Sequence, residues 1–194
     1  MESAHTVTEQ IQILRSPERC PSVVKLSGMK LTDEIAEQIA DILTINKQIT
    51  SLWLDNNLIR DKGAKALGDA LKSNTIMQYL NISSNQITFE GARYIFNGVK
   101  VNRSLRVLEF ANNNLASDDP NQKELFVAFQ FNKTITSINL SDDKLGTPSL
   151  IGIFEGIAHN REPSLQHLDV SGNLIGNAVS EYLRKGSICS CSDS

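Results

Sequence analysis

One phrase occurs six times along this chain, and it constrains the fold more than any other feature. The phrase is an apolar residue, two spacers, a second apolar residue, one spacer, a third apolar residue and, three positions later, usually Asn. Two clear copies are residues 49–59 and 77–87. Aligned on the second apolar residue, the copies fall at Val24, Leu52, Leu80, Leu108, Ile138 and Leu168, with spacings of 28, 28, 28, 30 and 30 residues. A fixed period of about 20–50 residues is typical of a solenoid, in which each repeat packs only on its neighbours.

Each copy predicts a short strand, a turn and a helix. In the second copy, Leu52 and Leu54 share one face of a strand, because side chains alternate between the two faces. Asn57 follows where the strand ends, so its amide can bond backbone groups of the turn. Asp61 suits a helix N-terminus. The apolar stripe expected on that helix consists of Ala64, Leu67 and Leu71.

The later copies are less regular than the first ones. The fourth gains two residues at the entrance to its helix, within residues 116–120. The fifth gains two residues near residues 161–163 and has Asp143 where Asn is expected. The lengthened fourth-repeat loop, with Asp119 and Pro120, is a secondary candidate for partner contacts, because loops often carry function.

The two ends of the chain lie outside the repeats. Residues 5–15 predict an amphipathic helix with Ile11 and Leu14 turned inward, at the place of a preceding repeat's helix. The sixth copy predicts a last helix through Ala178, Tyr182 and Leu183. We therefore expect an N-terminal capping helix in residues 1–20, six repeats in residues 21–185 and a disordered tail in residues 186–194.

The apolar-and-Asn phrases, together with the helix openings Gly63-Ala64 and Gly91-Ala92, resemble the leucine-rich repeat. The 28-residue period resembles its ribonuclease-inhibitor-like subclass. The resemblance implies an α/β fold: a right-handed horseshoe solenoid of about six repeats, with a parallel concave sheet and convex helices. The family uses this scaffold for many partners, so the resemblance implies a fold and not a partner.

Composition and charge narrow the classes of function. The net charge of −3 gives no long-range attraction to nucleic acid, so we expect no nucleic-acid partner. No apolar run is long enough to span a bilayer, and the N-terminal segment has no apolar signal-peptide region. The three cysteines, Cys20, Cys189 and Cys191, form an odd set that favours a reducing compartment. These features predict a cytoplasmic protein without a membrane span.

Signatures of catalysis are missing from the sequence. It has no Walker A motif, no glycine-rich dinucleotide motif, no H-E-x-x-H and no G-x-S-x-G. The three histidines, His5, His159 and His167, are far apart in the repeat frame, and the cysteines lack the spacing of a zinc site. We therefore expect no enzyme activity, no catalytic residue, no cofactor and no metal site.

Spacer residues of the strands are the informative ones, because they must point to the concave side. Trp53 and Tyr79 fall on neighbouring strands about 4.8 Å apart, so they are expected to touch. Trp53 is expected to be solvent-exposed, and such aromatic residues often anchor interfaces. The candidate protein-binding residues are Trp53, Asp55, Tyr79, Asn81, Glu109, Asn139, His167 and Asp169.

Acidic spacers on this face indicate a partner with a basic, partly apolar element. His167 beside Asp169 is either a pH-sensitive contact or a plain polar spacer. The competing interpretation of the whole set is an incidental aromatic pair among ordinary acidic spacers.

The leading hypothesis is a non-catalytic module that binds a protein on its concave face. Three alternatives stay open. The first is a regulator of a small GTPase, similar to the Ran GTPase-activating family, and the second is an actin-binding repeat domain similar to tropomodulin. The third is a bacterial effector secreted into a host cell. The sequence makes no prediction of the oligomeric state.

Overall fold

Six strands of three residues each form one parallel sheet, in the order in which they occur along the chain. The computed structural model describes residues 6–16, 18–119 and 122–174. The strands are β1 (Val23–Lys25), β2 (Ser51–Trp53), β3 (Tyr79–Asn81), β4 (Val107–Glu109), β5 (Ser137–Asn139) and β6 (His167–Asp169). Their register pairs the second apolar residues of successive phrases, for example Leu52 with Leu80. The predicted strands and their parallel arrangement are confirmed.

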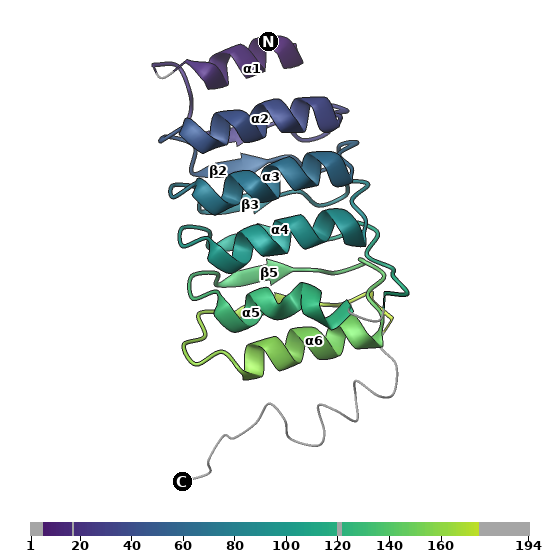
Figure 1. Cartoon of the computed structure of the whole chain (residues 1–194). Coiled ribbons are helices and arrows are strands. Elements are labelled where there is room, and N and C mark those ends of the chain that lie inside the picture. The colour runs from purple at the N-terminus through teal and green to yellow at the C-terminus, as the bar shows by residue number, and fades with distance from the viewer. Residues whose placement is uncertain (1–5, 17, 120–121, 175–194) are drawn as a thin grey trace.

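The helices stack along the other side of the sheet (Figure 1). They are α1 (Val7–Arg15), α2 (Asp33–Ile45), α3 (Asp61–Ser73), α4 (Phe89–Val101), the 3-10 helix η1 (Gln122–Val127), α5 (Ala128–Phe131) and α6 (Thr147–Ala158). The chain thus forms an α/β solenoid with one layer of strands and one layer of helices, as the period predicts.

The fourth repeat differs from its neighbours in the helical layer. A 3-10 helix and a four-residue α-helix replace the long α-helix of the second and third repeats. The lengthened loop precedes this segment, and the buried side chain of Gln122 ties the two together. Its Nε2 donates to the carbonyl of Ser117 at 2.6 Å, while its Oε1 accepts from the Ser149 hydroxyl at 3.1 Å. The two additional residues therefore change the helix and leave the strand register intact.

The N-terminal helix α1 is present, with Ile11 and Leu14 buried as predicted. A capping box begins it: the Thr6 hydroxyl accepts the N–H of Glu9, and the Glu9 carboxylate accepts the N–H of Thr6 at 2.7 Å. The helix packs on α2. Its role as a cap for the first repeat stays a prediction. The predicted last helix and the predicted tail of residues 186–194 lie outside the described residues.

The core lies between the sheet and the helices. The apolar positions of the phrase are buried in the second to fifth copies, as with Ile49, Leu52 and Leu54. Between the third and fourth repeats, Phe96 meets three other phenylalanine rings at centroid distances of 5.3–6.0 Å. Each such repeat therefore buries its apolar face only by stacking on its neighbours.

The Asn that closes each phrase bonds two repeats together. Nδ2 of Asn57 donates to the carbonyls of Leu26 and Leu54, both at 2.9 Å, and its Oδ1 accepts the N–H of Leu31 at 3.0 Å. We call this set the strand-end ladder. Its amide members are Asn57, Asn85, Asn113 and Asn173. The ladder supplies hydrogen-bond partners to backbone groups of the turns that follow the strands. This is the scaffold role predicted for the Asn residues.

A second ladder runs along the C-terminal ends of the helices. Nδ2 of Asn102 donates to the carbonyls of Leu71 and Asn74 in the preceding repeat, at 2.8 and 2.9 Å. Its Oδ1 accepts the N–H of Leu105 at 2.7 Å. This helix-end ladder consists of Asn46, Asn74, Asn102, Asn132 and Asn160. It closes the layer of helices as the strand-end ladder closes the turns beside the sheet.

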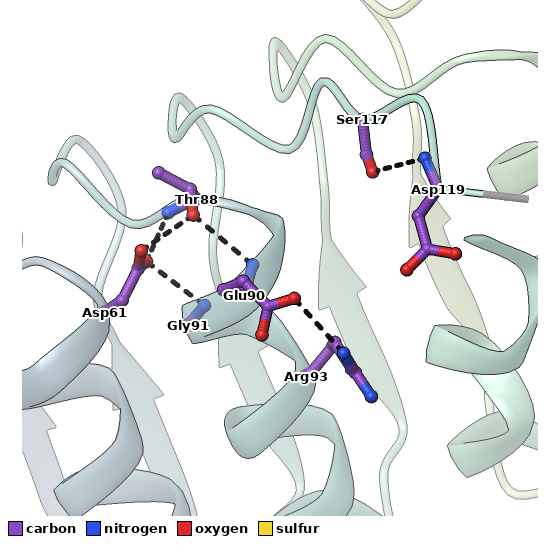
Figure 2. A network of polar contacts seen from close by, with 7 residues as sticks. All are labelled: Asp61, Thr88, Glu90, Gly91, Arg93, Ser117 and Asp119. Carbon is purple, nitrogen blue, oxygen red and sulfur yellow. Dashed lines mark hydrogen bonds and ion pairs between the residues drawn. The ribbon is translucent and has the colours of Figure 1, made fainter. Parts of the chain in front are cut away.

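Carboxylates at helix starts connect successive repeats at the opposite edge. Figure 2 shows Asp61 reaching the start of α4, where Oδ1 accepts the N–H groups of Thr88 at 2.7 Å and Gly91 at 3.1 Å. Its Oδ2 accepts the Thr88 hydroxyl at 2.8 Å. Asp33 bonds the N–H groups of Arg60 and Gly63 in the same way. Asp61 therefore lies at the start of its own helix, as predicted, and also caps the next one.

Replacing Asp61 by Ala is expected to lower the free energy of unfolding by about 1–2 kcal/mol, because the first amides of α4 lose their acceptor. Urea denaturation followed by circular dichroism measures the change. Asp69→Ala is the matched control, since Asp69 pairs only with Lys65 and Lys72 on an exposed helix surface. Equal effects of the two substitutions would contradict a capping role.

Candidate functional site

The face of the sheet away from the helices carries the predicted spacer residues. In each strand the central residue points into the core, and the two flanking residues point to the other face. The same face therefore receives two side chains from every strand, and those side chains differ from repeat to repeat.

An aromatic pair lies on β2 and β3. The rings of Trp53 and Tyr79 have centroids 4.6 Å apart and planes tilted by 31°. The predicted contact is confirmed. Both side chains are half-buried, so Trp53 is less exposed than its position on the sheet predicts. The physical reason is the contact itself, because each ring covers part of the other. The ammonium group of Lys25, paired with Trp53 across β1 and β2, lies 5.9 Å from the centroid of the indole.

Two acidic side chains, Glu109 and Asp55, lie near the aromatic pair. Burial, followed by the charges of Glu109 and Asp55, raises the pKa of Tyr79 to about 12, against the lowering effect of a hydrogen bond with Asn81. Asp55 is itself held in place, since its Oδ1 accepts the Ser27 hydroxyl at 2.6 Å and its Oδ2 accepts Nδ2 of Asn56 at 2.8 Å. The Tyr79 hydroxyl therefore lies in a negative potential that favours a cationic neighbour.

Three of the predicted site residues make hydrogen bonds that stabilise the turn after their own strand. Asn81, Asn139 and Asp169 each accept, through Oδ1, the N–H of the residue two positions later, which is Ser83, Ser141 or Ser171, at 2.8–3.0 Å. Asn81 is buried and offers little surface. The hydrogen bonds to Ser171 hold the pKa of the Asp169 carboxyl below its usual range. The recurring Asn/Asp-x-Ser pattern is the sequence signal for this role, which sequence reasoning missed.

The structure brings only part of the predicted set together. Glu109 is half-buried on β4, next to the strand that carries Tyr79. His167 is exposed on β6, two strands beyond Glu109. Neighbouring strands lie about 4.8 Å apart, so His167 and Asp169 lie apart from the aromatic pair. The compact cluster is therefore Trp53, Tyr79, Asp55 and Glu109, with Lys25 at its edge, and we call it the aromatic cluster.

The described residues contain no group of three or more His, Cys, Asp or Glu side chains that could hold a metal ion. Cys20, the cysteine within that part of the chain, accepts a hydrogen bond from Nδ2 of Asn46 at 3.3 Å, and burial raises the pKa of its thiol. It therefore belongs to the helix-end ladder. Within the same described ranges, no helix is long and apolar enough to cross a membrane.

Comparison with known proteins agrees with this architecture. A family model described as "Leucine Rich repeat" matches residues 73–96 and 162–178, which contain most of the third and sixth phrases. The chain has a leucine-rich-repeat fold. The ribonuclease-inhibitor-like subclass stays a prediction. No curated protein sequence is significantly similar to this chain.

Two of the solved structures that resemble this chain show the same fold. Leiomodin-1 actin-binding site 2 is 20% identical with a TM-score of 0.64, and the match covers 94% of this chain and 97% of that chain. The tropomodulin C-terminal domain of Caenorhabditis elegans is 14% identical with a TM-score of 0.53, covering 93% of this chain and 90% of that chain. At these identities the likeness concerns the fold.

Proposed function

We propose that this leucine-rich-repeat protein is a non-catalytic module of the cytoplasm that binds a protein partner on its concave face. The observation that carries the proposal is the half-exposed contact between Trp53 and Tyr79 on the face of the sheet away from the helices. Trp and Tyr supply large contact area at low entropic cost and dominate the energy of many interfaces.

The scaffold does not require aromatic residues at these positions. At the third position of the strand, the other repeats place Lys25, Asn81, Glu109, Asn139 or Asp169 where the second repeat has Trp53. The first, fourth and fifth repeats place Val23, Val107 or Ser137 where the third has Tyr79. Because the fold accommodates such different side chains there, its stability does not explain the aromatic pair, and this favours a role in binding.

Charge around the pair supports a partner with a basic, partly apolar element. The partner's apolar side chain would lie on Trp53 and Tyr79. Its Lys or Arg would lie on the Tyr79 side, within reach of Glu109, because Lys25 makes the Trp53 side positive. The remaining predicted residues, Asn81, Asn139, His167 and Asp169, stay predictions of a wider contact surface.

Replacing both Trp53 and Tyr79 by Ala is expected to weaken partner binding by about 2 kcal/mol or more, roughly 30-fold in Kd. The reason is loss of the apolar contact area at the centre of the surface. Pull-down with wild type and variant identifies the partner, and titration calorimetry then measures the affinity.

Tyr94→Ala is the control for that experiment, since Tyr94 lies on α4, on the side of the helices, where Lys65 covers its ring at 5.3 Å. It should leave affinity unchanged. Binding that survives the double substitution, while circular dichroism shows a folded protein, would place the contact elsewhere. Raising the salt concentration should weaken the wild-type complex if Glu109 and Asp55 take part.

Actin is the second candidate partner, favoured by the leiomodin-1 domain, which is named as an actin-binding site. Co-sedimentation of this chain with actin filaments tests it. If the chain binds actin and the double substitution abolishes that binding, actin is the partner of the Trp53 and Tyr79 surface. If the chain does not co-sediment with the filaments, actin is excluded as the partner. The GTPase-regulator and bacterial-effector hypotheses stay predictions without a supporting observation.

A further inference from the structure

Asp143 occupies the one position of the strand-end ladder that has a carboxyl instead of an amide. Its side chain is completely buried. Oδ1 accepts the N–H of Asn113 at 2.7 Å, whereas Oδ2 is buried and has no hydrogen-bond partner within the described part of the chain. A buried, unpartnered oxygen costs about 1–3 kcal/mol, and more if it is charged. The structure therefore leaves one group of this ladder unexplained.

The neighbouring ladder residue shows which donor is missing. One repeat later, Oδ1 of Asn173 accepts the N–H of Asp143, as Oδ1 of Asp143 accepts that of Asn113. Nδ2 of Asn173 then donates to the carbonyls of Leu140 and Val170, at 2.7 and 2.9 Å. By this equivalence, Oδ2 of Asp143 occupies the place of a donating nitrogen.

The backbone carbonyls around Asp143 give the same result. The carbonyl of Leu54 receives Nδ2 from both Asn57 and Asn85, and that of Ile82 receives Nδ2 from both Asn85 and Asn113. The carbonyls on either side of Asp143, those of Phe110 and Leu140, each receive a single ladder amide, at 2.6 and 2.7 Å. Each of these two carbonyls lacks one donor, and Asp143 is the residue between them.

No charged group on the turns around Asp143 would stabilise its carboxyl in the ionised form. The turns packed against it from the neighbouring repeats, residues 110–115 and 170–174, contain no ionisable side chain. On its own turn, Asp142 and Lys144 flank it, and both are exposed. Asp142 adds a like charge. An ionised Asp143 would thus be a buried anion facing carbonyl oxygens, which is strongly unfavourable.

We propose that Asp143 is a neutral, protonated acid in the native protein, and that its hydroxyl donates one of the hydrogen bonds which Nδ2 supplies in the other repeats. This hydrogen bond then stabilises the junction between the fourth and fifth repeats, and it is lost when the carboxyl ionises at alkaline pH. Trp53 and Tyr79 lie on the second and third repeats, so this hydrogen bond does not involve the aromatic pair of the proposed binding surface.

The electrostatics give the direction of the pH dependence. Burial, together with the charge of Asp142, raises the pKa of Asp143 to about 8, against the lowering effect of the Asn113 N–H. In an unfolded chain an Asp has a pKa of about 3.9. Between these values the folded state binds more protons than the unfolded state. The stabilisation is therefore fully present below about pH 4, is lost as pH rises toward 8, and changes no further above it.

Asp143→Asn tests the proposal, with urea denaturation of the full chain measured from pH 5 to pH 9. For wild type, the equilibrium constant for unfolding is expected to rise by up to about tenfold per pH unit below pH 8, relative to the variant. The variant should lack this component and exceed wild type in stability at pH 8. Asn85→Asp, the reverse change at a matched ladder position, should introduce such a dependence. Asp142→Asn should keep it.

Carboxyl carbon chemical shifts of labelled protein report the proton directly. A titration of Asp143 near pH 8 is expected, and it should be missing from the Asp143→Asn spectrum. A titration near pH 4 would overturn the proposal. Parallel pH profiles of wild type and Asp143→Asn in denaturation would overturn it as well, because the carboxyl would then carry the same charge in the folded and unfolded states.

Discussion

Replacing Phe96 by Ala is expected to lower the free energy of unfolding by about 3–5 kcal/mol. Phe96, on α4, is almost completely buried. Its ring meets those of Phe110, Phe126 and Phe129 at centroid distances of 6.0, 5.3 and 6.0 Å. Removing it leaves a cavity where the third repeat stacks on the fourth. Because the 3-10 helix of the fourth repeat rests on these rings, the surrounding structure has little means to refill that space.

Urea denaturation at several protein concentrations measures the loss for Phe96→Ala, and Phe131→Ala is the control. Phe131 ends α5 with 44% of its surface exposed, and Lys100 lies 4.9 Å from its ring. Truncating it creates no cavity, so a change well below that of Phe96→Ala is expected. A loss under ~1 kcal/mol for Phe96→Ala would mean that the cluster contributes little to the stacking of repeats.

Gly68→Ala is expected to destabilise the protein by about 3 kcal/mol, although alanine is the better helix former in isolation. Gly68 is buried in α3, and a methyl group there would overlap the backbone carbonyl of Tyr94 in α4. Gly98 lies against the carbonyl of Gly68 from the other helix. The two helices therefore approach backbone to backbone, and neither can move away without opening the core beneath.

Gly146→Ala provides the comparison for Gly68→Ala in thermal or urea denaturation. Gly146 has a φ of −84°, and an added methyl group would meet its nearest neighbour, Cδ of Pro148, at 3.7 Å. This contact is ordinary, so the substitution should be tolerated. Were Gly68→Ala as stable as wild type, the close approach of α3 and α4 would not limit the packing of the solenoid.

Several features of the aromatic cluster could be predicted from the sequence. The period of 2 within each strand assigns Trp53 and Tyr79 to one face, and the period of 28 residues puts them on neighbouring strands. Their contact follows from those two numbers and from the spacing of strands. How far each ring covers the other depends on side-chain rotamers, and for that reason the extent to which Trp53 is buried could not be determined from the sequence.

Local hydrogen bonding was harder to recognise in a single sequence. Asn81, Asn139 and Asp169 look like free polar spacers until the turn after each strand is known. The helix-end ladder was visible only as Asn74 and Asn102 at the ends of two helices. Its bonds join residues about 30 positions apart, and such pairs are defined only once the repeats are stacked.

By itself the sequence determined the repeat: the positions of its strands, their parallel order, the buried apolar residues and the scaffold role of the strand-end Asn. A solenoid is nearly one-dimensional, so a local pattern repeated at a fixed period specifies most of its architecture. The tertiary structure alone decided what happens between repeats. It showed that Asp61 caps the following helix, that Gly68 allows two helices to touch, and that Oδ2 of Asp143 is buried with no hydrogen-bond partner among the described residues. These features depend on the distances between atoms of adjacent repeats, which no single copy of the phrase contains.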